Sequence, residues 1–144
     1  MDCQKIIKKE VSFTGVGLHT GNETTVTFKP ALADSGVKFV RTDLPGRPEL
    51  PANILAAVEA PRRTTIKNKE VEVHTVEHIL AALAGLGLDN LIIEVNANEV
   101  PEIDGSSLPF AQMLARSGII EQREARRYAY LTEPVYVSQD GSYL

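Results

Sequence analysis

Cysteine, long apolar runs and an excess of positive charge are missing or scarce in this sequence. The single cysteine, Cys3, cannot form an internal disulfide, which fits a reducing compartment, so the cytoplasm is the expected location. The longest apolar run, residues 79–88, is too short to cross a bilayer, and residues 1–10 lack the apolar stretch of a signal peptide. The net charge is −4, so no sequence-wide positive field can hold a phosphate backbone, and we expect no nucleic-acid partner.

Hydrophobic alternation predicts β-strands in the first part of the chain. Apolar residues alternate with period two, and many are β-branched, over residues 6–13, 24–28 and 37–41. Residues 63–67 and 70–73 continue the pattern and predict a hairpin. We therefore expect a β-rich N-terminal part.

From Val76 onward the apolar residues change to helical spacing. They fall at positions 76, 79, 80, 83 and 86, which form one face of a helix. Thr75 stands where an N-cap residue is expected, and Gly85 and Gly87 end the helix. This is the clearest helix prediction in the chain.

Two further elements are predicted before the end of the first domain. Residues 91–95 are apolar and β-branched, as in a buried strand. Ser107 with Pro109 predicts the start of a second helix that runs to about residue 118. Strands and two helices share one core, so the expected fold class is α+β.

The C-terminal part of the sequence predicts the beginning of a second domain. Residues 121–127 are charged and lack apolar periodicity, whereas residues 128–131 and 135–137 resume a strand pattern. Asp140–Gly141 predicts a turn, and the arm after it consists only of residues 142–144. Such an arm leaves an unpaired strand edge, through which the chain could self-associate.

Residues 74–78 (HTVEH) form the most informative motif. If Thr75 caps the helix, Glu77 and His78 lie in its first turn, where the helix dipole favours an anion and a neutral imidazole that can bind a metal. The same residues match H-x-x-E-H, a metallopeptidase motif in which His74 and His78 both bind zinc, but this requires His74 inside the helix. A third interpretation is an ordinary helix start without a metal.

Two other segments are candidates for a binding site. Residues 15–21 (GVGLHTG) contain three glycines that let the backbone turn tightly and approach a ligand, with His19 projecting from the loop. Residues 99–107 form a turn into the second helix, with Asp104–Gly105 as turn residues. Taken singly, each segment has an ordinary structural explanation.

In their order and spacing, four segments resemble the UDP-3-O-acyl-N-acetylglucosamine deacetylase family. They are Gly15–Gly21 (GVGLHTG), Thr75–Leu83 (TVEHILAAL), Leu88–Val95 (LDNLIIEV) and Asp104–Ser106 (DGS). The resemblance implies two similar domains, each a two-layer α/β sandwich with a mostly antiparallel sheet packed against two helices. Residues 1–126 would form the first deacetylase domain, and residues 127–144 would begin a second, truncated domain.

The resemblance also implies a function and site residues. The family is zinc-dependent, and it hydrolyses the acetamide of UDP-3-O-acyl-N-acetylglucosamine in lipid A biosynthesis, in organisms with a lipopolysaccharide outer membrane. Glu77 would be the general base that activates water, His78 a Zn²⁺ ligand, and Leu18 and His19 substrate-binding residues of the glycine-rich loop. The other zinc ligands belong to the second domain of the family, so we expect this chain alone to be inactive.

Two alternative functions follow from the residues. One is a metallopeptidase that uses His74, Glu77 and His78, and it requires a helix that includes His74. The other is a metal-free α/β module that binds a partner through its last strand, and its partner binding would not depend on His78.

Overall fold

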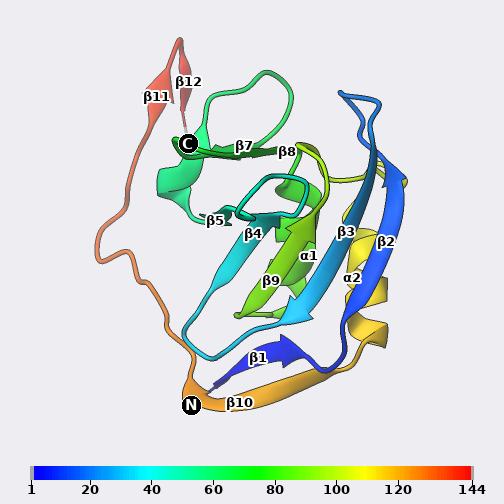
Figure 1. Cartoon of the computed structure of the whole chain (residues 1–144). Coiled ribbons are helices and arrows are strands. Elements are labelled where there is room, and N and C mark those ends of the chain that lie inside the picture. The colour runs from blue at the N-terminus through cyan, green and yellow to red at the C-terminus, as the bar shows by residue number, and fades with distance from the viewer. Residues whose placement is uncertain (1, 144) are drawn as a thin grey trace.

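A five-stranded sheet forms the centre of the computed structural model, which describes residues 2–143 (Figure 1). Its strand order is β2-β3-β9-β4-β5, and neighbouring strands are antiparallel except for β4 and β9, which run parallel. The register pairs Val26 with Val95 and Phe28 with Ile93, so these buried side chains share one face of the sheet. The strands are β2 (Val11–Val16), β3 (Glu23–Pro30), β4 (Val37–Arg41), β5 (Glu49–Pro51) and β9 (Leu91–Val95).

Three smaller antiparallel sheets surround this centre. One has the order β6-β7-β8 and follows the short 3-10 helix η1 (Ile54–Ala56), and another pairs β1 with β10. The last is the hairpin of β11 and β12 near the C-terminus. Their bounds are β1 (Cys3–Ile7), β6 (Ala57–Val58), β7 (Thr65–Lys67), β8 (Glu72–His74), β10 (Ile119–Ala125), β11 (Ser138–Gln139) and β12 (Ser142–Tyr143).

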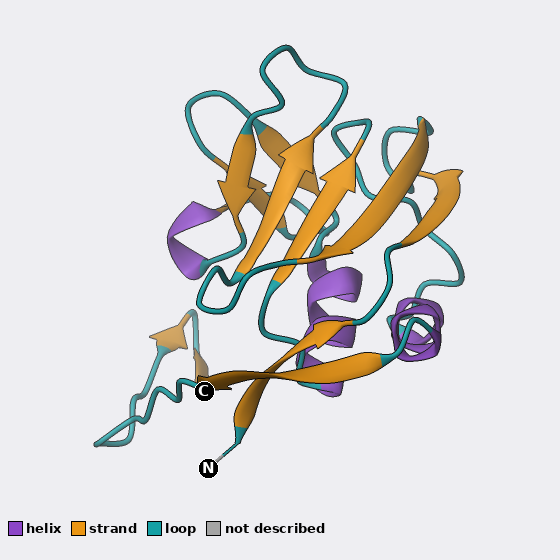
Figure 2. Cartoon of the chain, turned by 60° about the horizontal axis from the view of Figure 1, so that its bottom comes forward, coloured by secondary structure: helices purple, strands orange, loops and turns teal. Residues whose placement is uncertain are grey.

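Two helices cover one face of the five-stranded sheet. Helices α1 (Glu77–Leu86) and α2 (Leu108–Arg116) lie on the same side of it in both views (Figures 1 and 2). Ile79 of α1 and Phe110 of α2 are buried against the sheet side chains, and the rings of Phe28 and Phe110 meet edge to face with centroids 6.3 Å apart. Full burial of a side chain of this size stabilises a fold by roughly 1.5–3 kcal/mol.

This architecture confirms the expected α+β fold, with a mostly antiparallel sheet on one side and two helices on the other. The strands predicted at 24–28, 37–41 and 91–95 correspond to β3, β4 and β9. The predicted hairpin corresponds to β7 and β8, and the second predicted helix to α2. None of the helices among residues 2–143 is long and apolar enough to cross a membrane.

Two predictions in the outer strands are wrong. Residues 6–13 form two strands rather than one, because residues 8–10 leave the strand conformation: β1 pairs with β10, whereas β2 pairs with β3. Residues 121–127 lack apolar periodicity, yet residues 119–125 form β10. Backbone hydrogen bonds to β1 specify this strand, and they place little demand on its side chains.

The C-terminal segment also differs from its prediction. Residues 128–131 and 135–137 form no strand, because no neighbouring strand among residues 2–143 pairs with them. The turn at Asp140–Gly141 is confirmed, and both of its residues have positive φ, as a two-residue hairpin requires. Leu144, at the end of the predicted arm, lies outside the described residues.

Residues 127–143 are exposed, and few side-chain interactions tie them to the rest of the chain. Tyr128 Oη donates to Asp2 Oδ2 at 2.6 Å, and Arg127 Nη2 lies 2.7 Å from Asp34 Oδ1. The predicted domain boundary after residue 126 stays a prediction.

Candidate functional site

The three segments that the sequence singled out lie together in the fold. Val16, at the end of β2, forms an isolated antiparallel bridge with Glu102, whose N–H donates to the Val16 carbonyl at 2.9 Å. His74, at the end of β8, forms a parallel bridge with Glu99, and its N–H donates to the Asn98 carbonyl at 2.8 Å. Residues 99–102 therefore lie between the glycine-rich loop and the start of α1.

Glu77 and His78 occupy the first turn of α1, as predicted. Val76 and Ile79 beside them are fully buried and anchor the helix in the core, whereas Glu77 and His78 are only half-buried. Glu77 Oε2 accepts a hydrogen bond from the backbone N–H of Thr64 at 3.0 Å. An anion in this position is also stabilised by the positive end of the helix dipole.

The prediction that Thr75 caps this helix is wrong. Val76 occupies the N-cap position with a helical backbone and makes no capping hydrogen bond. Thr75 lies one residue earlier with a φ of 60°, in the left-handed region. Its hydroxyl donates to Glu99 Oε1 at 2.6 Å, so the side chain is hydrogen-bonded to Glu99 and does not cap the helix.

The backbone at Thr75 is strained. A β-branched residue in the left-handed region is a conformational outlier that costs on the order of 1–3 kcal/mol, and such residues cluster at functional sites. The strain is tolerated because Thr75 is buried and its hydroxyl is hydrogen-bonded to Glu99. The strained residue thus lies directly between β8 and the turn that carries Glu77 and His78.

The glycine-rich loop presents the two residues expected to bind substrate. Leu18 is 63% exposed and His19 is exposed beside it. The loop is closed at its base by a hydrogen bond from the Gly21 N–H to the Gly17 carbonyl at 2.9 Å. A Cβ on Gly17 would lie only 2.6 Å from Glu99 Oε2, so glycine is required there by close approach.

Glu99 is the residue of this site that sequence reasoning missed. Its side chain is fully buried, and its carboxylate accepts hydrogen bonds from the loop on one side and from Thr75 on the other. Burial raises the pKa of Glu99, but the hydrogen bonds from Thr75 and Thr20 outweigh burial and hold its pKa below the ordinary value of 4.5. Nothing in the local sequence distinguishes Glu99 from an exposed carboxylate.

His74 lies outside the helix, contrary to what the metallopeptidase interpretation requires. It ends β8, is buried, and its Nδ1 lies 3.1 Å from Thr65 Oγ1. Its Nε2 lies 3.3 Å from Glu72 Oε1. Burial lowers the pKa of His74, with Arg63 adding to this and Glu72 and Glu99 opposing it. Both ring nitrogens therefore have partners in the fold.

Apolar surface adjoins Glu77. A depression of about 210 Å³ lies between η1, β7 and α1, and Thr64, whose N–H binds Glu77, is on its rim. Its lining is mostly apolar: Ala52, Asn53, Ile54, Ala57, Thr64, Ile66 and Leu80. Among residues 2–143 no three His, Cys, Asp or Glu side chains are grouped so as to hold a metal ion.

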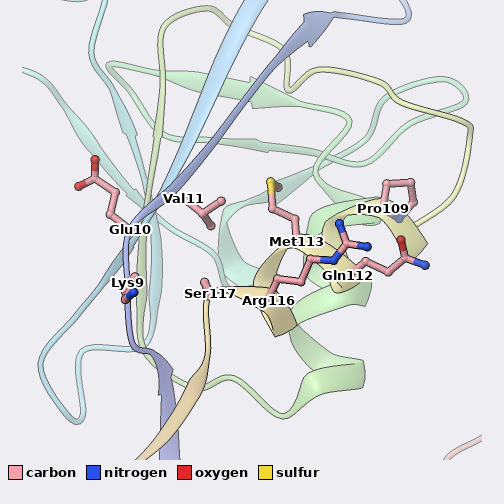
Figure 3. Close-up of a pocket in the computed structure, with 8 residues that line it drawn as sticks. All are labelled: Lys9, Glu10, Val11, Pro109, Gln112, Met113, Arg116 and Ser117. Carbon is pink, nitrogen blue, oxygen red and sulfur yellow. The ribbon is translucent and has the colours of Figure 1, made fainter.

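A larger surface pocket lies apart from the three segments. It has a volume of about 500 Å³ and is formed by α2 and the residues around the start of β2 (Figure 3). Its lining residues are Lys9, Glu10, Val11, Pro109, Gln112, Met113, Arg116 and Ser117. None of these residues belongs to the three segments, so this pocket is separate from the candidate site.

Comparisons with known proteins agree with the resemblance. The family model described as "LpxC: UDP-3-O-acyl N-acetylglycosamine deacetylase" matches residues 4–144. The chain is 47% identical over 142 residues to a UDP-3-O-acyl-N-acetylglucosamine deacetylase of Shewanella halifaxensis, and 44% identical over 139 residues to one of Bdellovibrio bacteriovorus. It is 50% identical over 132 residues to a bifunctional enzyme LpxC/FabZ of Chlorobaculum tepidum.

The matches cover nearly all of this chain but only part of each relative. They include 98% of the chain and 46% of the Shewanella protein, and 96% of the chain and 46% of the Bdellovibrio protein. For the Chlorobaculum protein the shares are 92% and 28%. The chain thus spans about half the length of the single-function relatives that it matches.

Proposed function

Because the chain belongs to the UDP-3-O-acyl-N-acetylglucosamine deacetylase family, we propose that it is the first of two similar domains of a zinc-dependent enzyme. That enzyme would hydrolyse the acetamide of UDP-3-O-acyl-N-acetylglucosamine in lipid A biosynthesis, in the cytoplasm. The observation that supports this most is the position of Glu77 and His78 in the first turn of α1, which Thr75 and Glu99 connect to the loop that exposes Leu18 and His19.

Glu77 is the proposed general base. Its Oε2 accepts the Thr64 N–H, which fixes the orientation of the carboxylate, and among residues 2–143 no hydrogen-bond donor contacts Oε1. A carboxylate held in this way can take a proton from a water molecule placed at its second oxygen.

His78 is the proposed zinc ligand of this domain. A catalytic zinc site uses three protein ligands and one open position, so residues 2–143 do not by themselves fit such a site. We propose that the remaining ligands belong to the second domain and that the 144-residue chain alone has no deacetylase activity. His74 contributes no ligand in this proposal, because its two ring nitrogens already have partners.

Leu18 and His19 are the proposed substrate contacts of the glycine-rich loop. The backbone N–H groups of His19 and Thr20 donate to Glu99 and so point into the protein. These two N–H groups are therefore not free to bind a substrate, whereas the exposed side chains are: Leu18 offers apolar surface and His19 a hydrogen-bonding ring. This arrangement suits a sugar nucleotide with an acyl chain better than a phosphate held by backbone amides.

The test uses a two-domain protein, meaning this chain joined to the second domain of the family. Glu77→Gln should lower acetate release by roughly 10²–10⁴-fold, the usual contribution of a general base, while bound zinc is retained. His78→Ala should remove both zinc and activity. Activity would be followed by mass spectrometry of the free amine, and zinc by atomic absorption.

His74→Ala is the matched control, since it removes a neighbouring imidazole that has no catalytic role in the proposal. It should leave zinc content unchanged. Full activity of the Glu77→Gln and His78→Ala variants would refute the assignment, as would acetate release by the 144-residue chain alone.

A further inference from the structure

Glu99 connects the glycine-rich loop, which carries the proposed substrate contacts, to the start of α1, which carries the proposed catalytic residues. Its Oε2 accepts hydrogen bonds from the Thr20 N–H and the Thr20 hydroxyl, both at 2.7 Å, and the His19 N–H is 3.1 Å from each carboxylate oxygen. Its Oε1 accepts the Thr75 hydroxyl at 2.6 Å. One carboxylate thus holds the substrate loop through both of its oxygens and the entrance to α1 through Oε1.

The donors around Glu99 are all neutral. No ion pair within residues 2–143 includes Glu99, although its side chain is fully buried. A buried carboxylate that relies on neutral donors keeps its place only if all of them are well directed, because an unmatched buried charge is very costly. Moving either the loop or the helix entrance would therefore disturb the other.

The backbone on both sides of the carboxylate is adapted to it. Gly17 leaves room for Oε2, where a Cβ would lie at 2.6 Å, and Thr75 adopts a φ of 60° that presents its hydroxyl to Oε1. A glycine required by close approach and a threonine with positive φ, one in each segment, thus accompany the same side chain.

We propose that Glu99 is a positioning residue that couples the loop of Leu18 and His19 to the helix turn of Glu77 and His78. The inference rests on the proposed function, because it gives the two segments the roles of substrate contact and catalysis. It assigns Glu99 no contact with substrate: the carboxylate acts through the His19 and Thr20 N–H groups and the Thr20 and Thr75 hydroxyls. The two hydroxyl contacts, one to each segment, can be removed separately by substitution.

The experiment compares Thr20→Val with Thr75→Val in the two-domain protein. Valine has the shape of threonine and the same β-branch, so the strain at position 75 is kept while the hydroxyl is lost. Thr20→Val loosens the substrate loop and should mainly raise KM, whereas Thr75→Val loosens the helix entrance and should mainly lower kcat. We expect changes of about 10-fold, since a small misplacement of a catalytic group costs up to about 10²-fold.

Glu99→Gln and Glu99→Ala complete the series. A glutamine can keep its oxygen toward Thr20 and donate its amide to the Thr75 hydroxyl, which can also accept. Glu99→Ala should lower kcat and raise KM. Glu99→Gln should change both constants much less and therefore retain most of the activity. Equal loss in the two variants, or the same KM and kcat pattern for Thr20→Val and Thr75→Val, would overturn the proposal.

A second measurement tests the coupling between the glycine-rich loop and the start of α1 without any enzyme assay. Amide hydrogen exchange of the 144-residue chain, read by NMR, reports the His19 and Thr20 N–H groups directly. Thr75→Val should speed their exchange, although Thr75 lies far from them in sequence, and should leave β9 amides unchanged. Unchanged exchange at His19 and Thr20 would overturn the coupling, whereas failure of the deacetylase assay in the unsubstituted protein would count against the proposed function alone.

Discussion

Buried polar side chains flank both ends of β9, and the two clusters differ in charge and in the elements that they join. Asn90, just before β9, donates to the side-chain oxygens of Gln4 and Gln122 at 2.7 Å and accepts the Gly36 N–H at 2.8 Å. Glu99, shortly after β9, is an anion that holds a loop and a helix entrance. The side-chain partners of Asn90 are neutral amides that tie β1 and β10 to the body of the protein, and the one carboxylate at this cluster, Asp34, which accepts from Gln4 at 2.9 Å, is exposed.

The difference between the two clusters supports the positioning role that we propose for Glu99. Neutral amides satisfy each other at moderate cost and suffice to hold strands together. A buried carboxylate next to strained backbone is more costly, so its presence indicates a constraint beyond stability. On this argument the Asn90 cluster maintains the fold, and the Glu99 cluster maintains the relative positions of the loop and the first turn of α1.

The largest expected effect is the loss of stability in Glu99→Ala. This variant leaves the donors of His19, Thr20 and Thr75 without their acceptor, so the free energy of unfolding should fall by about 4 kcal/mol. Asn90→Ala, which loses three hydrogen bonds, should cost about 2 kcal/mol. Urea denaturation of the 144-residue chain measures both.

The effects of Asn90→Ala and Glu99→Ala should differ in where they occur in the structure as well as in their size. Asn90→Ala should leave the NMR signals of His19 and Thr20 in place, whereas Glu99→Ala should shift them. If Asn90→Ala moved these signals as much as Glu99→Ala, the two clusters would not be separate, and the distinction between them would be wrong.

A smaller effect is expected when Gly17 is replaced by alanine. The new Cβ would lie 2.6 Å from Glu99 Oε2 and 2.7 Å from Thr20 Oγ1, so overpacking should cost about 1–3 kcal/mol. Gly85→Ala is the control in a helix, where a Cβ meets nothing within 4 Å and should stabilise the protein by about 0.5–1 kcal/mol. Thermal unfolding of both variants checks the signs, and a neutral Gly17→Ala would contradict the close approach.

The smallest effect is a pH dependence that Glu99→Gln should remove. The folded-state pKa of Glu99 is lowered, because the hydrogen bonds from Thr75 and Thr20 outweigh the effect of burial, so the ionised carboxylate stabilises the fold above its ordinary pKa of 4.5. That contribution is lost as the pH falls through the lower, folded-state value. Any stability advantage of the wild type over Glu99→Gln should therefore shrink below pH 4.5.

The other carboxylates with lowered pKa, Asp2, Asp43 and Glu72, are present in both proteins and cancel in this difference. Chemical denaturation at several pH values measures the difference. A difference that stays constant across the acidic range would show that Glu99 does not titrate with the predicted sign.

Sequence patterns predicted the parts of the fold that local physics determines. The apolar spacing from Val76 located α1, and alternation located β3, β4 and β9. Strand β10 escaped detection because its stability comes from pairing with β1 at the other end of the chain. Residues 128–131 have strand-forming side chains, but the described chain offers them no partner strand.

In the candidate site, too, local sequence patterns could not predict contacts between segments that lie far apart in the chain. Motifs gave Glu77, His78, Leu18 and His19 as candidates, because their residue types and spacing resemble a known family, and their roles stay predictions. They could not give Glu99, whose proposed role depends on where the glycine-rich loop and Thr75 meet in space. They also misassigned Thr75 as a cap, because its hydroxyl finds a stronger, charged acceptor in Glu99.

The most direct test of the account is the zinc content of the purified 144-residue chain after dialysis at neutral pH, measured by atomic absorption. We expect the chain to retain far less than one zinc per molecule, because it contributes His78 as a single ligand. Retention of one zinc per chain, lost on replacing either His74 or His78, would contradict it, because that result requires a complete local site that includes His74.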